Sequence, residues 1–160
     1  MGERAMRLKE QAIEDQGEMV AVLKKVRYVT LAMCKDEEPY LVTVSHGYDG
    51  ERNAIYFHCA FEGKKIEILK ANNSVWGEAV DNLGTQEGEC GQRYATTHFR
   101  GTVTFVEDVD EKRHGLSILI SAFGDDPVKF FEKPNSEDRL NKLNIGRIDI
   151  NHMSGKRSMD

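Results

Sequence analysis

Two lysines at the start of a predicted helix are the clearest sign of chemistry in this sequence. Residues 55–57 favour a β-strand, Gly63 permits an unusual turn, and from Lys64 onward the apolar residues follow helical spacing. Lys64 and Lys65 therefore lie in the first helical turn, where the helix dipole is already positive. Free backbone N–H groups, the dipole and two ammonium groups together suit a phosphate. The alternative interpretation is a solvated lysine pair that happens to begin a helix.

Composition limits the partners that such a site could serve. The chain has 160 residues and a net charge of −5, so a general nucleic-acid binder is not expected and any basic site must be local. We expect one domain over residues 1–160, with its core at about 15–155. No apolar run reaches the roughly 20 residues of a membrane span, and the charged start lacks the apolar core of a signal peptide. A cytoplasmic protein is expected.

The strand patterns predict a mainly β fold with peripheral helices. Six strands are expected, at residues 26–34, 40–46, 54–60, 74–80, 94–106 and 144–153. Short helices are expected at 16–25, capped by Asp15, at 62–70, from Asp108 or Asp110 to about 123, and at 128–131. Many strands with few short helices between them predict a closed or nearly closed six-stranded antiparallel barrel.

The connections carry further expectations. The first three strands are interpreted as an antiparallel meander, and Gly101 as the site of a bulge. The glycine-rich stretch 81–91 is interpreted as a long loop, and Ser154 onward as a basic tail. No GxGxxG follows a first strand and no GxxxxGK[ST] is present, so a doubly wound nucleotide-binding sheet is not expected.

Other reactive side chains suggest weaker hypotheses. His46 and His58 lie on adjacent predicted strands and could approach each other, but a metal would also need a ligand such as Cys59 or Glu78. Because successive strand residues point to opposite faces, His58 and Cys59 cannot easily share a metal, and no metal site is expected. The usual GxSxG marker of a serine nucleophile is absent.

The cysteines indicate no disulfide framework. Cys34, Cys59 and Cys90 are odd in number and widely spaced. Cys59 is expected to be a buried small hydrophobe, and Cys90, in its glycine-rich stretch, to be exposed. A reactive thiol at Cys90 is the alternative interpretation.

The phosphate site combines best with a flat heterocycle. The neighbouring strand from Val42 to His46 can place backbone N–H and C=O groups along the edge of such a ring. Flavin recognition by a barrel wall needs those groups at the ring and cations at the phosphate.

Three segments carry a resemblance to a known family. They are Pro39–Ser45, then Tyr56–Ala60 followed by Gly63-Lys64-Lys65, and Tyr94–Thr97 before Gly101. In this order they resemble the pyridoxamine 5′-phosphate oxidase-like split-barrel flavoproteins, with the nitroimidazole-resistance (5-nitroimidazole reductase) branch as the most similar. The likeness covers residues 15–155.

The resemblance implies an FMN-binding homodimer with the cofactor in a cleft between two subunits. Lys64 and Lys65 would bind the phosphate, and Val42–Ser45 would edge the isoalloxazine ring. The cofactor-binding residues that it implies are Val42, Thr43, Val44, Ser45, Phe57, His58, Lys64, Lys65, Thr96 and Thr97.

Three of these positions have more specific implied roles. Phe57 and His58 would lie beside the ribityl chain or the ring, and His58 is also the implied catalytic residue, because a histidine near the flavin matters for substrate in this branch. Thr96 and Thr97 would approach the flavin from either subunit.

The chain also departs from the oxidases that give the family its name. Those enzymes carry arginine and lysine where this chain has Thr43, Val44 and Ser45, and their C-terminal tryptophan and arginine motif is missing. Pyridoxamine phosphate is therefore not the expected substrate.

Three functions remain open at this stage. The first is an FMN-dependent oxidoreductase that passes electrons, with NAD(P)H as a possible reductant, to a small acceptor such as a nitroaromatic. The second is a non-catalytic flavin carrier or sensor. The third is a haem-binding split barrel, with His46, His58, His98 or His152 as axial ligand.

Overall fold

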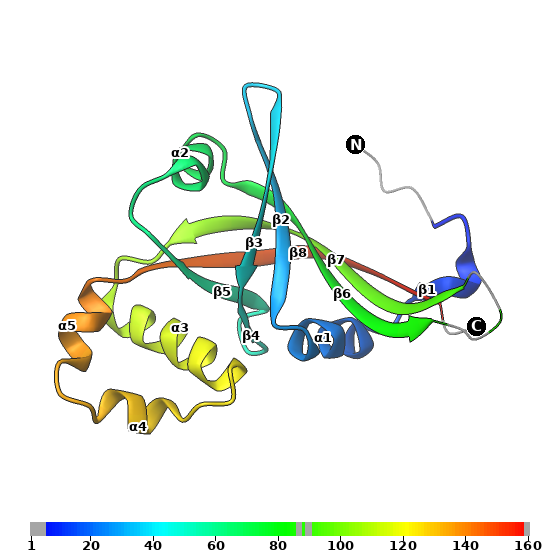
Figure 1. Cartoon of the computed structure of the whole chain (residues 1–160). Helices are drawn as coiled ribbons and strands as arrows, with labels where there is room; N and C mark the ends of the chain where they lie inside the picture. Colours follow the sequence, from blue (N-terminus) through cyan, green and yellow to red (C-terminus); the bar gives the residue numbers. More distant parts are fainter. Residues whose placement is uncertain (1–5, 86–87, 89–90, 159–160) are drawn as a thin grey trace.

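The computed structural model describes residues 6–85, 88 and 91–158 of the chain as a sheet with five helices beside it (Figure 1). The strands are β1 (Ala12–Ile13), β2 (Tyr28–Lys35), β3 (Glu38–Ser45), β4 (Gly47–Asp49), β5 (Ala54–Cys59), β6 (Ser74–Thr85), β7 (Gln92–Phe105) and β8 (Asn144–Ser158). The helices are α1 (Gln16–Lys25), α2 (Lys64–Ala71), α3 (Val109–Ala122), α4 (Pro127–Phe131) and α5 (Ser136–Asn141), with a 3-10 turn at Lys9–Gln11. No helix in these ranges is long and apolar enough to cross a membrane.

The sheet is antiparallel throughout and turns back on itself. Its strand order is β3-β2-β6-β7-β8-β5-β4, with β1 added on β8. Because β3 also lies against β5, the two ends of this order approach each other and form a barrel that is split between these strands. The predicted fold class, mainly β with an antiparallel split barrel and peripheral helices, is confirmed.

The strand count and some connections differ from the sequence predictions. The described residues form eight strands rather than six, because β1 and β4 are too short to show a hydrophobic period. The predicted meander of the first three strands is wrong: β5 pairs with β4 and β8, whereas β3 pairs with β2. The short helix α5 was not predicted.

Strand β6 continues to Thr85 and β8 to Ser158, so the predicted loop begins later and the predicted tail is mostly strand. Both extensions pair with β7. Strand β7 supplies backbone hydrogen-bond partners for these polar residues, whose sequence by itself predicts a loop. Cys90 lies outside the described residues.

Several local predictions are confirmed. Asp15 caps α1 by accepting a 2.8 Å hydrogen bond from the Glu18 amide, and Asp108 caps α3 in the same way through the Glu111 amide. The β7–β8 register shifts between Arg100 and Gly101, as expected for a bulge.

The barrel core contains two phenylalanine rings that lie over glycines of the neighbouring strand. Phe57 pairs with Gly146 across β5 and β8, and Phe99 pairs with Gly77 across β7 and β6. Both rings are fully buried. A Cβ added at Gly146 would come within 2.3 Å of the Phe57 ring, and one at Gly77 within 2.0 Å of the Phe99 ring. The two rings can therefore occupy these positions only because the glycines have no Cβ atom.

A second apolar cluster lies outside the barrel, where α3, α4 and α5 gather on one side of the sheet, away from α2 (Figure 1). Strand alternation explains this cluster, because Tyr56 points outward while Ile55 and Phe57 point into the barrel. A side-chain hydrogen bond adds to the docking of α3 on β4: His114 Nε2 lies 2.6 Å from Asp49 Oδ2, and the Asp49 side chain is only 3% exposed.

The glycine under Phe57 gives a first prediction. Gly146→Ala should lower the free energy of unfolding by about 1–3 kcal/mol, because the new methyl group must displace a buried ring. Gly50→Ala is the control, since an added Cβ there meets only an ordinary 3.8 Å contact with Tyr48. Urea denaturation measures both variants, and equal stability of the two would contradict the close fit at Gly146.

The Asp49–His114 pair gives a second prediction. Burial alone would raise the pKa of Asp49, but the hydrogen bonds from His114 and from the amides of Glu51 and Arg52 together hold it below the ordinary value of 3.8. A carboxyl with a lowered folded pKa contributes stability that is present above its unfolded pKa and is lost as the pH falls through the folded value.

Asp49→Asn should therefore lower stability at pH 7 by about 1–3 kcal/mol. The difference from the parent protein should shrink as the pH falls below about 3.8. Urea titrations between pH 7 and pH 3 measure this difference, with the exposed Asp125→Asn as control. A difference that does not change with pH would show that the Asp49 carboxylate charge contributes nothing.

Candidate functional site

The start of α2 is an open helix N-terminus. Gly63 is the N-cap with φ +119°, a conformation that favours glycine, and no side chain of the described residues caps this end. The Gly63 carbonyl accepts the first helical bonds, from the amides of Ile66 (2.9 Å) and Glu67 (3.1 Å). A Cβ added at Gly63 would meet no atom within 4 Å, so the space beside the helix start is open. The backbone amides of Lys64 and Lys65, which come before these bonds, can therefore donate hydrogen bonds to an anion.

The two lysines of this turn, here called the lysine pair, lie across the split in the barrel. Lys64 Nζ is 3.0 Å from Glu38 Oε1 and 5.1 Å from the centre of the Tyr40 ring, both on β3. Lys65 Nζ is 5.9 Å from the centre of the Phe57 ring on β5. The lysine pair thus places two cations at the opening between β3 and β5.

The surrounding charges leave the lysine pair available. Lys64 and Glu38 are both largely exposed, and such surface ion pairs contribute little, so an incoming anion can compete with Glu38. Burial raises the pKa of the Cys59 thiol, and the nearby Lys65 ammonium opposes that rise. Cys59 is therefore held as a neutral thiol close to Lys65.

The groups of β3 that are available to a ligand at the split are mainly backbone groups and not side chains. Val42 and Val44 point into the barrel, opposite Leu31 and Val29 of β2, whereas Thr43 and Ser45 point outward. Among the described residues β3 pairs only with β2, so its other edge presents N–H and C=O groups, unpaired within that part of the chain, that can meet the rim of a flat ring.

Phe57 and His58 do not share a face. The Phe57 side chain is fully buried in the barrel, whereas His58 is exposed on the outer face of β5 and lines an apolar cavity against α3 and α5. Strand alternation explains the separation. The contact between the Phe57 ring and the Lys65 ammonium therefore lies on the inner face of β5, and His58 lies on the outer face.

Thr96 and Thr97 lie far along β7 from the lysine pair. The hydroxyl of Thr97 donates to the Met19 carbonyl of α1 at 2.9 Å, and that of Thr96 donates to the Lys156 carbonyl at 3.2 Å. The end of β6 that follows α2 pairs with Thr102, five residues or about 17 Å further along the strand. Within one subunit the two threonines therefore do not join the lysine pair.

The histidines form no metal centre in the part of the chain that the structure describes, where no group of three His, Cys, Asp or Glu side chains gathers. His46 is buried, with Nε2 2.9 Å from the Leu23 carbonyl, and burial lowers its pKa. His98 Nε2 lies 3.0 Å from Glu78 Oε1.

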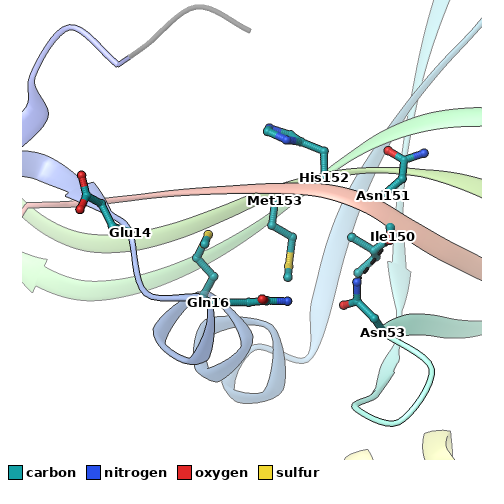
Figure 2. Close-up of a pocket in the computed structure, with 8 residues that line it drawn as sticks. Glu14, Gln16, Asn53, Ile150, Asn151, His152 and Met153 are labelled. Carbon is teal, nitrogen blue, oxygen red and sulfur yellow. Dashed lines mark hydrogen bonds between the residues drawn. The ribbon is translucent and has the colours of Figure 1, made fainter.

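Sequence reasoning missed a polar hollow of about 300 Å³ between α1 and β8 (Figure 2). Met153 and Gln16 point toward each other across it, while His152 points to the other side of β8. Its lining residues are Glu14, Gln16, Met19, Asn53, Ile150, Asn151, His152 and Met153. None of the predicted flavin-contact residues is among them, although His152 is one of the candidate haem ligands, and no local pattern could find a hollow built from three distant segments.

The described residues thus form an antiparallel split barrel with a basic helix start at its opening. The chain belongs to the pyridoxamine 5′-phosphate oxidase family, whose model matches residues 15–157. No curated protein matches this chain.

Solved structures with the same fold include flavoproteins. A candidate 5-nitroimidazole antibiotic resistance protein from Bacteroides thetaiotaomicron is 26% identical with a TM-score of 0.79, over 91% of this chain and 86% of that one. An FAD-binding protein from Mesorhizobium loti is 21% identical (TM-score 0.68; 92% and 97% covered). An FAD and haem binding protein from Mycobacterium smegmatis is 17% identical (TM-score 0.77; 94% and 74% covered).

Proposed function

We propose that this protein binds FMN, with the phosphate on the lysine pair and the isoalloxazine along the free edge of β3. The observation that carries this proposal is the open start of α2, where two cations and free amides lie across the β3–β5 split. Family membership and the flavin-binding neighbours support a flavin. One pair of cations at one helix start fits a single terminal phosphate, which favours FMN over FAD.

FMN, when bound, supplies electron and hydride transfer. The residues of this chain would bind and orient it: the lysine pair holds the phosphate, and the backbone of β3 meets the ring edge. His58 lies on the opposite face of β5 from Phe57, so its proposed contact with a substrate would have to be made from that outer face. Thr96 and Thr97 would reach the flavin from the second subunit, because their own lysine pair is distant.

We propose further that the flavoprotein is an oxidoreductase that uses NAD(P)H to reduce a small acceptor such as a nitroaromatic. The neighbour assigned to 5-nitroimidazole resistance supports this choice of acceptor. Steady-state NADH and NADPH oxidation with a nitroimidazole acceptor tests it. A flavin that neither nucleotide reduces would favour a carrier or sensor instead.

A homodimer is the assembly that best fits the exposed apolar surface. Leu41, Ala32 and Trp76 form one row across the outer face of β3, β2 and β6. Leu41 is 65% and Trp76 46% exposed, and Tyr28 and Val80 lie exposed on the same face. Exposed apolar patches of this kind mark interaction sites, and we propose a second copy as the partner.

The phosphate assignment gives a third prediction. Replacing Lys64 and Lys65 together by Ala should weaken FMN binding at least tenfold, because each charge-assisted hydrogen bond contributes about 1.5–3 kcal/mol. Lys70→Ala, at the other end of the same helix, is the control. Fluorescence titration with FMN measures the dissociation constants, and an unchanged value for the double variant would remove the phosphate from this site.

The visible spectrum of the purified protein separates the cofactors. Flavin absorbs near about 370 and 450 nm, whereas a Soret band near about 400 nm would indicate haem and contradict the proposal. Mass identification of the compound released on denaturation distinguishes FMN from FAD.

The proposed dimer face gives a fourth prediction. Leu41→Glu and Trp76→Glu should each shift the protein from dimer to monomer, because a buried unpaired charge is costly at an interface. Light scattering after gel filtration measures the mass. Val128→Glu is the control, since Val128 is 64% exposed but lies on α4. A parent protein that is monomeric at micromolar concentration would contradict the proposal.

A further inference from the structure

A cavity of about 330 Å³ lies between the outer face of β5 and helices α3 and α5. Its floor is apolar and comes mainly from α3, with α4 and the end of α5 closing it. The apolar lining residues are Leu116, Leu119, Ile120, Phe123, Phe130 and Leu143. A volume near the lower end of the range for small-molecule sites, about 300–1,000 Å³, suits a compact ligand.

The remaining lining residues of this cavity are all basic. They are His58 from β5, Arg139 from α5 and Lys142 just after it. Arg139 and Lys142 are three residues apart, so they lie on one side of the helix end. The Arg139 guanidinium lies 5.2 Å from the centre of the Phe130 ring. Neither Arg139 nor Lys142 forms an ion pair with a described residue, and no acidic residue lines the cavity.

We propose that this cavity binds a small amphipathic anion: a medium-chain carboxylate whose apolar body fills the floor and whose carboxylate meets Arg139 and Lys142. The apolar lining excludes a fully polar ligand, and three basic side chains with no acidic residue in the same lining favour an anionic head. This cluster is local, since the chain as a whole carries a net charge of −5. At the packing density of protein interiors, the volume accommodates a body of roughly ten carbon atoms.

This binding site is distinct from the proposed phosphate site. Neither lysine of the pair lines the cavity, and the neighbouring residues Phe57 and His58 point to opposite faces of β5. The inference therefore does not depend on flavin binding, and direct titration with a carboxylate tests it separately.

Isothermal titration of the full-length protein with decanoate is the first test, with decylamine as the matched cation. Decanoate should bind saturably to one site per chain and at least tenfold more tightly than decylamine. Hydrogen exchange should slow in α3 and α5 on addition of decanoate, and not in α2. Absence of saturable decanoate binding, equal binding of decylamine, or protection elsewhere in the chain would overturn the proposal.

Variants assign the two ends of the ligand. Arg139→Ala combined with Lys142→Ala should weaken decanoate binding about tenfold, because two exposed cations contribute at the low end of charge-assisted bonds. Lys129→Ala, an exposed lysine of α4 outside the cavity, is the control. Ile120→Phe should weaken decanoate binding by filling the floor, in a variant that keeps a cooperative thermal transition. Decanoate binding that is insensitive to both changes would place the ligand elsewhere.

Discussion

The close contact between Phe57 and Gly146 is the constraint on which the rest of the structure depends. The ring can lie over β8 only because position 146 has no Cβ, and a methyl group there would meet it at 2.3 Å. This contact fixes the inward face of β5, and with it the positions of Cys59 and of the Lys65 ammonium above the ring. Phe99 and Gly77 repeat the arrangement across β6 and β7. Two such pairs, one on each side of the β7–β8 ladder, let the sheet curve around filled space.

The alternation of β5 gives its two faces different chemistry. The inward face ends at the split of the barrel, beside the lysine pair, and the outward face supports α3 and carries His58 to the apolar cavity. Adjacent residues in the chain thus serve separate surfaces. A shift of one residue in the register of β5 would exchange them, and the Phe57–Gly146 pairing opposes that shift.

The sequence predicted those features that depend on residues close together in the chain, such as helix caps and helix starts. Asp15 was predicted as a helix cap, and Asp108 as one of two candidates with Asp110, because a side-chain oxygen and an amide three residues later form the interaction. Gly63-Lys64-Lys65 begins α2 as expected. The partner of β5 could not be read in this way, because β8 is about 90 residues away and nothing near β5 specifies it. The opposite orientations of Phe57 and His58 followed from alternation, but the apolar cavity beside His58 depends on α5, whose six residues have no clear period.

Flavin binding and dimerisation, as proposed, should reinforce each other. Strand β3 would contribute to both: its free backbone edge would meet the ring, and its outward residue Leu41 would belong to the apolar face that a second copy covers. Thr97 of β7 lies five residues, or about 17 Å, along the strand from Thr102, which pairs with the start of β6, so in the proposed site these threonines would come from the other subunit. A ligand that contacts both subunits binds the dimer more tightly than the monomer, and by linkage it must stabilise the dimer by the same free energy. If both proposals hold, the exposed Leu41 and Trp76 side chains would contribute to cofactor affinity through the dimer, although neither needs to contact the flavin.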